Sequence, residues 1–212
     1  MLSVVIPAYE MQGKGLYYLS RAISSITPDE GVEIVVSDDS EGDEIRHYCE
    51  KYEIKYIRNC RTRGTSGNLN NAIDHATGDI IKVLFQDDKL CSVNDFLNVK
   101  TWGFCRSKHN NGRADHYPYH PDSIYALAMG CNTYGSPSAL AFRRTPIRFD
   151  ENLKWLLDCD FYAKMTKRYG LPEILNTWVY ITEWEGQATN TVATGSVRLK
   201  EAEIMSYRYA DI

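Results

Sequence analysis

No apolar run in this 212-residue chain approaches the roughly 20 residues that a membrane-spanning helix needs. Positive charge is not in excess either: the formal net charge is −4, so no overall field draws the protein to nucleic acid or anionic lipid. Met1 leads directly into the strand-like LSVVIP, with neither a basic stretch nor a cleavage site. From these features we expect a protein of the cytoplasm.

Several common site motifs are missing as well. The six cysteines form no CxxC pair and no zinc-like spacing with histidine, so we expect reduced thiols. The chain has no P-loop pattern, and no G-x-G-x-x-G follows a predicted strand. His116 and His120 are four residues apart, but Pro118 between them argues against a helix, so we expect a solvated loop.

The first half of the chain alternates strand-like and helical patterns. The predicted strands cover residues 2–6, 32–37, 54–58 and 79–85, and the helices between them cover 16–26, 43–53 and 68–76. This alternation is typical of an α/β domain with a Rossmann-like, mostly parallel central sheet and helices on both faces. A chain of this length suits a single domain.

The second half is less regular. Ser92 is the expected N-cap of a helix over residues 93–107, and a polar loop follows at 109–122. A strand within 135–144, a helix near 154–169 and a last amphipathic helix at 197–209 complete the prediction.

Acidic side chains gather where three of the predicted strands end. In open α/β sheets, ligands bind outside the carboxyl ends of the strands. Those ends carry Glu10, Asp38, Asp39, Asp87 and Asp88. This grouping predicts a site at that edge of the sheet.

These acids have both functional and ordinary explanations. Asp87 and Asp88 suit a hard cation such as Mg²⁺ or Mn²⁺, whose remaining positions phosphate oxygens can fill, or they cap the turn before Leu90. Asp38 and Asp39 can accept hydrogen bonds from a ribose or base, or they form an Asx-type turn. Taken alone, neither motif decides between the two explanations.

The loop from Arg61 to Asn68 carries two arginines and two glycines directly before a helix. Glycine lets the backbone approach a ligand, and helix N-terminal amides with nearby guanidinium groups favour phosphate. A plain loop with Ser66 or Asn68 as the helix cap explains the same residues.

Asp158 and Asp160 lie in an otherwise apolar helix start. The helix dipole stabilises an acid at this position, which is the ordinary explanation for one of them. A carboxylate flanked by Leu157 and Phe161 could instead be a general base whose pKa is adjusted by partial burial.

Together these motifs resemble the family 2 glycosyltransferases, which have the GT-A fold. The resemblance runs from VVIPAYE and IVVSDDS through RGTSGNLNNAIDHATGDIIKVLFQDD to GSPSALAFRR and WLLDCDFYAKM. It implies one GT-A domain over 1–212, with a nucleotide-sugar-binding half at 1–90 and an acceptor-binding and catalytic-base half at 91–212. It also implies a nucleotide-diphosphate sugar donor, usually UDP-linked, a Mn²⁺ or Mg²⁺ ion, and inverting transfer to a hydroxyl.

The resemblance assigns roles residue by residue. Asp158 would be the general base, Asp88 with Asp87 would hold the metal, and Ser136 and Ser138 would lie near sugar or acceptor. The donor would contact Pro7, Ala8, Tyr9, Glu10, Asp38, Asp39, Arg63, Asn68, Asn70, Gln86 and Asp87.

The chain departs from the family pattern around the donor site. Gln86 replaces the first acid of a full D-x-D, so metal ligation rests on Asp88. Leu69 stands where many members have arginine, which leaves the diphosphate to Arg61 or Arg63.

Two further departures concern the second half. Leu157 precedes Asp158 where an acid is frequent. Residues 181–186 contain no histidine where many members have one near the metal, which leaves Glu183 or Glu185 as substitutes.

The 105–135 region and the final helix are the expected acceptor surface, because no further acceptor domain follows in the sequence. Aromatic residues that could stack on sugars there are Trp102, Tyr117, Tyr119, Tyr125, Tyr134 and Trp184. Two other functions fit the same fold. One is a nucleotidyltransferase that joins a nucleoside triphosphate to a sugar phosphate, although its Gly- and Arg-rich signature is missing after the first strand. The other is a non-catalytic module that binds nucleotide sugars or carbohydrate.

Overall fold

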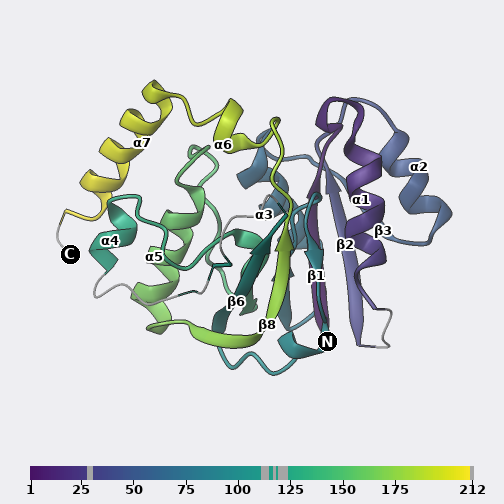
Figure 1. The fold of residues 1–212 in the computed structure, drawn as a ribbon, viewed down its shortest axis with the longest axis horizontal. Coiled ribbons are helices and arrows are strands. Elements are labelled where there is room, and N and C mark those ends of the chain that lie inside the picture. The colour runs from purple at the N-terminus through teal and green to yellow at the C-terminus, as the bar shows by residue number, and fades with distance from the viewer. Residues whose placement is uncertain (28–30, 111–114, 117, 119–123, 211–212) are drawn as a thin grey trace.

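The structure of the protein, a computed structural model, describes residues 1–27, 31–110, 115–116, 118 and 124–210, with the side chains of all but 125, 188 and 189. These residues form an eight-stranded sheet in the order β3-β2-β1-β4-β7-β6-β8-β5 (Figure 1). The strands are β1 (Leu2–Ala8), β2 (Val32–Asp38), β3 (Lys55–Arg58), β4 (Ile80–Val83), β5 (Lys89–Leu90), β6 (Trp102–His109), β7 (Leu140–Arg143) and β8 (Glu173–Ile181). The helices are α1 (Gly15–Ser24), α2 (Glu44–Lys51), α3 (Thr65–His75), α4 (Ile124–Ala128), α5 (Leu157–Tyr169), α6 (Ala188–Thr191) and α7 (Gly195–Arg208), with 3-10 turns η1 (Met11–Gly13), η2 (Asn94–Phe96) and η3 (Pro137–Ala139).

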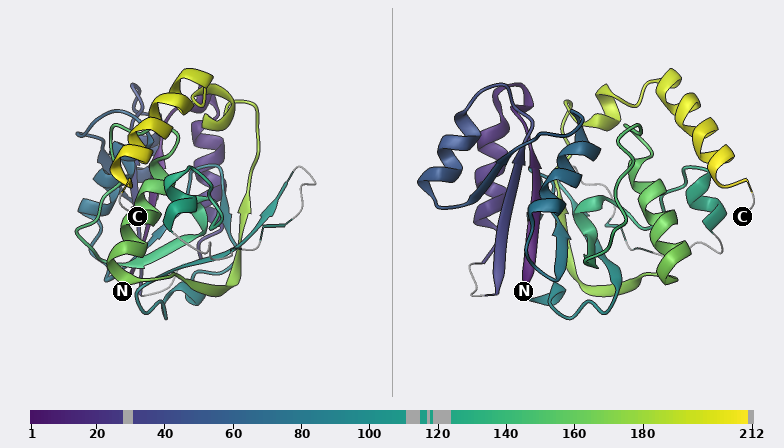
Figure 2. Two further views of the ribbon diagram at one scale, coloured as in Figure 1. Left: turned by 90° about the vertical axis from the view of Figure 1, so that its left-hand side faces the viewer. Right: turned by 180° about the vertical axis from the view of Figure 1, so that it is seen from behind.

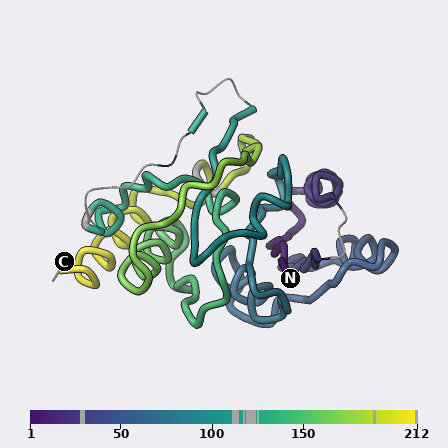
Figure 3. Tube along the Cα trace, turned by 90° about the horizontal axis from the view of Figure 1, so that it is seen from below, coloured from purple at the N-terminus to yellow at the C-terminus, as the bar shows by residue number. Residues whose placement is uncertain are grey.

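The first half of the sheet is parallel, as the sequence predicts. β1 pairs in parallel with β2 and β4, and β2 pairs in parallel with β3. Every residue of β1 is buried, which a strand covered by helices on both faces requires. In Figure 3 the purple coil of α1 and the blue coil of α3 lie on opposite sides of the strands. The predicted α/β class is therefore confirmed.

The second half of the sheet mixes directions. β7 is antiparallel to both β4 and β6, β8 is parallel to β6, and β5 closes the edge antiparallel to β8. Parallel neighbours still outnumber antiparallel ones. The strand predicted within 135–144 and the helices predicted near 154–169 and 197–209 are present as β7, α5 and α7.

The helix predicted over residues 93–107 is wrong. Val93 and Phe96 are buried around η2, but the helical turn ends there, and the chain continues into β6. Gly103 lies tightly against β8, because a Cβ at this position would come 2.5 Å from the backbone oxygen of Glu173. The spacing of Val93 and Phe96 is therefore explained by a single helical turn, and it does not indicate a longer helix.

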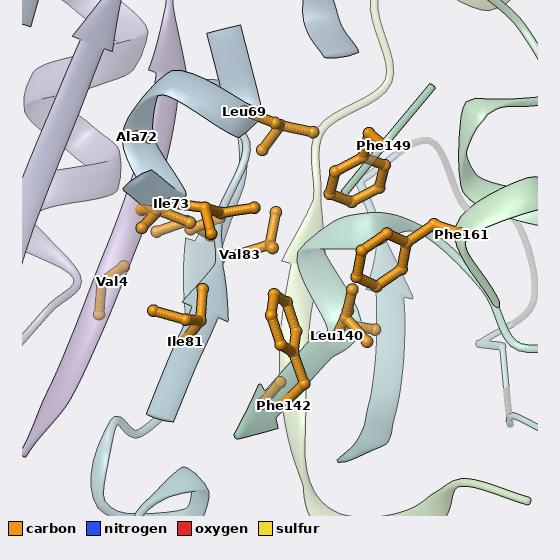
Figure 4. Packing of buried hydrophobic residues seen from close by; sticks show 14 of the residues in the cluster. Val4, Leu69, Ala72, Ile73, Ile81, Val83, Leu140, Phe142, Phe149 and Phe161 are labelled. Atoms are coloured by element: carbon orange, nitrogen blue, oxygen red, sulfur yellow. The ribbon is translucent and has the colours of Figure 1, made fainter. Parts of the chain in front are cut away.

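One buried core joins the two halves of the chain. Leu69 of α3 is fully buried and lies beside Phe149 (Figure 4). The Phe149 ring stacks on Phe161 of α5 with 4.2 Å between centroids, and Phe161 also packs against Phe142 of β7. Aromatic pairs of this kind add about 0.5–1.5 kcal/mol beyond the area that they bury.

The carboxyl ends of the parallel strands, where the candidate site is expected, lie at one end of the molecule. In Figure 1, β1, β2 and β8 run toward the same end, and the N-terminal end of α5 lies there too. Residues far apart in sequence, from about 8 to about 182, therefore meet at this edge.

Part of the expected acceptor surface lies outside the described residues: His120, Tyr117, Tyr119 and the side chain of Tyr125. His116 forms an isolated antiparallel bridge with Ser107. Within the described part of the chain, no helix has the length and apolar character to cross a bilayer.

Glu33 of β2 provides a test of the sheet's electrostatics. Burial alone would raise its pKa, but hydrogen bonds from Lys55, Ser3 and Thr77 outweigh burial and lower the pKa from 4.5 to about 2. The carboxylate therefore stabilises the fold fully above pH 4.5, and this stabilisation is lost as the pH falls toward 2.

We expect Glu33→Gln to lower the free energy of unfolding at pH 7 by about 1–3 kcal/mol. The difference from wild type should shrink as the pH falls below 4.5, as measured by urea unfolding at several pH values. Glu50→Gln, which removes an exposed pair with Arg46, should cost less than about 0.5 kcal/mol. A Glu33→Gln deficit that does not vary with pH would contradict this account.

Candidate functional site

Two adjacent carboxylates form the centre of the candidate site. Asp88 follows β4, is 2% exposed, and accepts a hydrogen bond from the backbone N–H of Thr182 at 2.9 Å. Asp87 accepts one from Nε1 of Trp184 at 3.0 Å. Burial raises the pKa of Asp87, and burial together with the Asp87 charge raises the pKa of Asp88 well above its ordinary value. Ionising both groups at once is therefore unfavourable, although the charge of Lys82 lowers the pKa of Asp88 in part.

A buried lysine lies near the pair. Lys82 of β4 is fully buried, and its Nζ donates to the backbone oxygens of Val83, at 2.8 Å, and of Ser138. Burial lowers the pKa of Lys82 to about 8. Ser138 receives the N–H of Phe85 on its Oγ at 2.9 Å and also hydrogen-bonds Asp88. Ser138 thus connects the start of β7 to the acid pair.

The donor set of the pair fits a hard divalent cation. Among the described residues no group of three or more His, Cys, Asp or Glu side chains forms a complete metal cage. One or two carboxylates are nevertheless enough protein ligands for Mg²⁺, which completes its shell with phosphate oxygens and water. Asp88 and Asp87 would hold such an ion.

The segment Thr182–Gln187, here called the TEWEGQ segment, stands where the family often has a metal-linked histidine. Its Trp184 packs against Tyr18, with 5.7 Å between centroids, and under Nζ of Lys14 at 5.4 Å. Glu183 pairs with His109 at 2.7 Å, and Glu185 is exposed. The carboxylate of Glu183 is therefore engaged by a histidine from β6.

Gln86 has a bracing role that an acid could not fill. It is 2% exposed, and its Oε1 accepts from the N–H of Tyr9 at 2.9 Å. Its Nε2 donates to the carbonyls of Tyr9, at 3.1 Å, and of Gly15, at 2.6 Å. A carboxylate accepts but cannot donate, so the departure from D-x-D ties the end of β1 to α1.

The two acids after β2 have different surroundings. Asp38 is fully buried and accepts from the hydroxyl of Tyr56 and the N–H of Ser40, both at 2.9 Å. Asp39 is more exposed and accepts from the N–H of Gly64 at 2.7 Å. Arg63, 65% exposed, donates to the backbone oxygen of Asp39 at 3.0 Å. Arg63 is thus the exposed charge here, Asp39 is partly exposed with both oxygens hydrogen-bonded, and Asp38 is enclosed.

The asparagines at the start of α3 also differ. Asn68 donates to the carbonyl of Ala8 at 2.9 Å, and its buried Oδ1 has no hydrogen-bond partner among the described residues. Asn70 is 1% exposed and makes hydrogen bonds with both the N–H and the carbonyl of Phe149. Asn68 therefore has a buried acceptor that lacks a partner among the described residues, whereas Asn70 holds the loop at 149.

The remaining donor-site positions are placed as follows. Glu10 accepts the N–H of Glu41, and Tyr9 is 43% exposed, with its pKa raised by burial and then by Asp87. Pro7 and Ala8 are buried residues of β1. Arg61 pairs with Asp74 and Glu151 at 2.9 and 2.5 Å, so its guanidinium is committed within the protein.

Asp158 lies in the first turn of α5 and is partly exposed. Its Oδ2 accepts from Nδ2 of Asn132 at 2.7 Å, and Asn132 also hydrogen-bonds the backbone of Gly135. Burial raises the pKa of Asp158, which moves the carboxyl toward the range useful for proton transfer near neutral pH.

Asn132 was not predicted as a site residue. No sequence signal distinguishes CNTYG from an ordinary turn, since its importance depends on a partner 26 residues away. Residues 132–138 run from this Asn132–Asp158 contact to the Ser138–Asp88 contact. This segment therefore lies between the acid pair and the candidate base.

The comparisons with known proteins agree with the sequence resemblance. Residues 3–97 match the family model described as glycosyl transferase family 2. Over 99 residues the chain is 34% identical to the GalNAc(5)-diNAcBac-PP-undecaprenol beta-1,3-glucosyltransferase of Campylobacter jejuni subsp. jejuni. This match covers 43% of the chain and 31% of the length of that relative.

Solved structures extend the likeness to nearly the whole chain. S. aureus TarS 1-349 in complex with UDP has a TM-score of 0.60 and 20% identity over 97% of this chain and 70% of that one. The same protein in complex with UDP-GlcNAc has a TM-score of 0.65 and 19% identity, over 99% of this chain and 66% of that one. The predicted resemblance to the family 2 glycosyltransferases is therefore confirmed by sequence in the first half, and the GT-A fold is confirmed throughout.

The position of Asn70 gives a test that separates support from ligand binding. We expect Asn70→Ala to lower the free energy of unfolding by about 2 kcal/mol or more, because it leaves buried backbone groups of Phe149 unpaired. Asn152→Ala, at an exposed position of the same loop, should cost less than about 0.5 kcal/mol. Calorimetric titration of folded Asn70→Ala with UDP and Mn²⁺ should give the wild-type Kd; a large loss of affinity would instead make Asn70 a donor ligand.

Proposed function

We propose that the protein is a metal-dependent glycosyltransferase that moves a sugar from a nucleotide-diphosphate sugar, with UDP as the first nucleotide to test, to a hydroxyl acceptor. The observation that carries the proposal is the adjacent acid pair after β4, in which Asp88 is 2% exposed and Asp87 accepts a hydrogen bond from Trp184. Burial raises the pKa of both carboxyls, so a bound cation would favour their ionised forms. The GT-A fold and the named activity of the relative support the same conclusion. The proposal includes a cytoplasmic location and the division into a donor half, 1–90, and an acceptor half, 91–212.

The donor is expected to lie along the edge formed by β1, β2 and β4. Asp39 is the partly exposed acid after β2, and Asn68 offers its unpartnered Oδ1 to a donor N–H or hydroxyl. Pro7, Ala8, Tyr9, Glu10 and Asp38 form the wall of that edge, while Gln86 and Asn70 support it from within. Arg63 is the nearby exposed cation.

The chemistry requires charge neutralisation at one end and proton removal at the other. A bound Mn²⁺ or Mg²⁺ would supply positive charge toward the diphosphate leaving group. Asp158, held by Asn132, accepts the proton of the attacking hydroxyl. Attack from the face opposite the leaving group gives inversion, which is the outcome that we expect.

Asp88→Asn tests the metal role. The variant keeps an acceptor for the N–H of Thr182 and removes the buried member of two adjacent negative charges, so the Tm of the free protein should stay equal or rise. The Tm increase that UDP with Mn²⁺ gives the wild type should vanish, since ligands stabilise only the states that they bind. Asp95→Asn, at an exposed site, is the matched control and should behave as wild type. Full UDP–Mn²⁺ stabilisation in Asp88→Asn would refute the assignment.

Asp158→Asn tests the base. Turnover, followed as release of UDP with a panel of hydroxyl acceptors, should fall by about 10²-fold or more, while UDP–Mn²⁺ binding is retained. The base must be ionised, and burial raises the pKa of Asp158. The wild-type kcat should therefore fall as the pH is lowered, and this fall should begin at a pH above that expected for an ordinary aspartate. That acid limb should be absent in the variant. Donor binding without turnover in the wild type, across the whole panel, would favour a binding module.

A further inference from the structure

The helix α7 makes hydrogen bonds to the chain on both sides of Asp158. Glu201 of α7 is 3% exposed, and its Oε1 accepts the backbone N–H of Lys154 at 2.7 Å. Its Oε2 accepts the N–H groups of Trp155 and Leu156 at 2.9 and 2.8 Å. These three amides come directly before the first residue of α5, so a single carboxylate fixes the backbone that leads into the helix.

A second attachment follows two residues beyond Asp158. Asp160 is fully buried and accepts from the guanidinium of Arg208 at 2.5 Å and from the hydroxyl of Tyr209 at 2.9 Å. Arg208 also pairs with Asp150 at 2.5 Å. Asp158 is therefore held between two contacts that come from the same C-terminal segment.

The location of α7 agrees with these contacts. In Figure 1 and in the right view of Figure 2, the yellow helix α7 lies beside the end of α5 that faces the site. α7 lies outside residues 3–97, which the family model matches. The role of α7 therefore rests on the contacts of this structure and not on the family match.

We propose that Glu201 is a positioning residue that fixes residues 154–156, and through them the first turn of α5, so that Asp158 keeps its contact with Asn132. This inference rests on the proposed function where it concerns turnover. A shift of the α5 start would move the Asp158 carboxylate relative to the acceptor hydroxyl, and displacements near 1 Å can cost about 10²-fold in rate. The donor edge at β1 and β4 would be unaffected.

Glu201→Gln is the test. Glutamine replaces one carboxylate oxygen with an NH₂ group, which is a donor and cannot accept a hydrogen bond from a backbone N–H. Glu203→Gln is the matched control, since Glu203 is exposed on the same helix. In the folded Glu201→Gln protein, kcat should fall by about tenfold or more with an unchanged KM for the donor. Glu203→Gln should match wild type in both. An unchanged kcat, or an equal loss in donor affinity, would overturn the proposal.

A measurement without turnover separates this inference from the proposed function. The side-chain amide resonances of Asn132 report on its hydrogen bond to Asp158. They should shift in Glu201→Gln and not in Glu203→Gln; no shift overturns the proposal even if kcat falls. If the wild type transfers no sugar, the proposed function fails, and the Asn132 resonances alone decide the role of Glu201.

Two further variants complete the design. If Glu201→Gln does not fold, Glu201→Asp keeps the charge on a shorter side chain and should give a smaller change of the same kind; a folded Glu201→Asp with wild-type kcat and wild-type Asn132 resonances overturns the proposal.

In the double variant Asp158→Asn/Glu201→Gln, loss of kcat should not exceed that of Asp158→Asn, because the residue being positioned is already gone. Additive losses would assign Glu201 a general structural role and overturn the proposal.

Discussion

The repulsion between two neighbouring carboxylates at the end of β4 is the constraint around which the site is built. Asp88 is enclosed, and Asp87 sits beside it under Trp184. Protein hydrogen bonds from Thr182 and Trp184 reduce the cost of this arrangement but bring no full positive charge. The buried ammonium of Lys82 lies on the protein side, where it donates to backbone oxygens. The charge of Lys82 lowers the pKa of Asp88 without cancelling the effect of burial, and the proposed function adds a cation from solution to the pair.

Side-chain amides hold the frame around these charges. Gln86 joins β1 to α1, Asn70 holds the loop at 149, and Asn132 connects Asp158 to the Gly135 turn. An amide both donates and accepts, so it can pair with a backbone N–H and a carbonyl at once without adding charge to the interior. Neutral braces of this kind leave the site acids as the dominant charges at the sheet edge.

The sequence was sufficient for the parallel half of the fold, because strands buried on both faces give mostly apolar runs such as those of β1 and β4, where Ser3 and Lys82 are the polar exceptions. It was insufficient for β6 and β8. Gly103 lies close to Glu173 of β8, which is 70 residues away in the sequence. No local sequence pattern predicts that these two strands pair. β8 alternates between exposed and buried positions over only part of its length, so its periodicity is weak.

The site divides in the same way. The acid pair stands out in the sequence, since two acids after an apolar strand are costly without a purpose. The roles of the amides do not stand out, because Gln86 and Tyr9 are 77 residues apart and Asn70 and Phe149 are 79 apart. Whether a buried amide faces a ligand or a loop depends on that distant partner. Asp38 shows the same dependence, since Tyr56 and Ser40 occupy oxygens that the motif alone would leave for a nucleotide.

The two ends of the proposed reaction are supported by different parts of the chain. The donor end is built on strands and on the core that Leu69 and Phe149 share, so its geometry follows from burial of apolar surface. The base end depends on a helix start held by the carboxylate of Glu201 and on the ion pair of Arg208 with Asp160. A polar support can be altered without dismantling the core, whereas a strand end cannot.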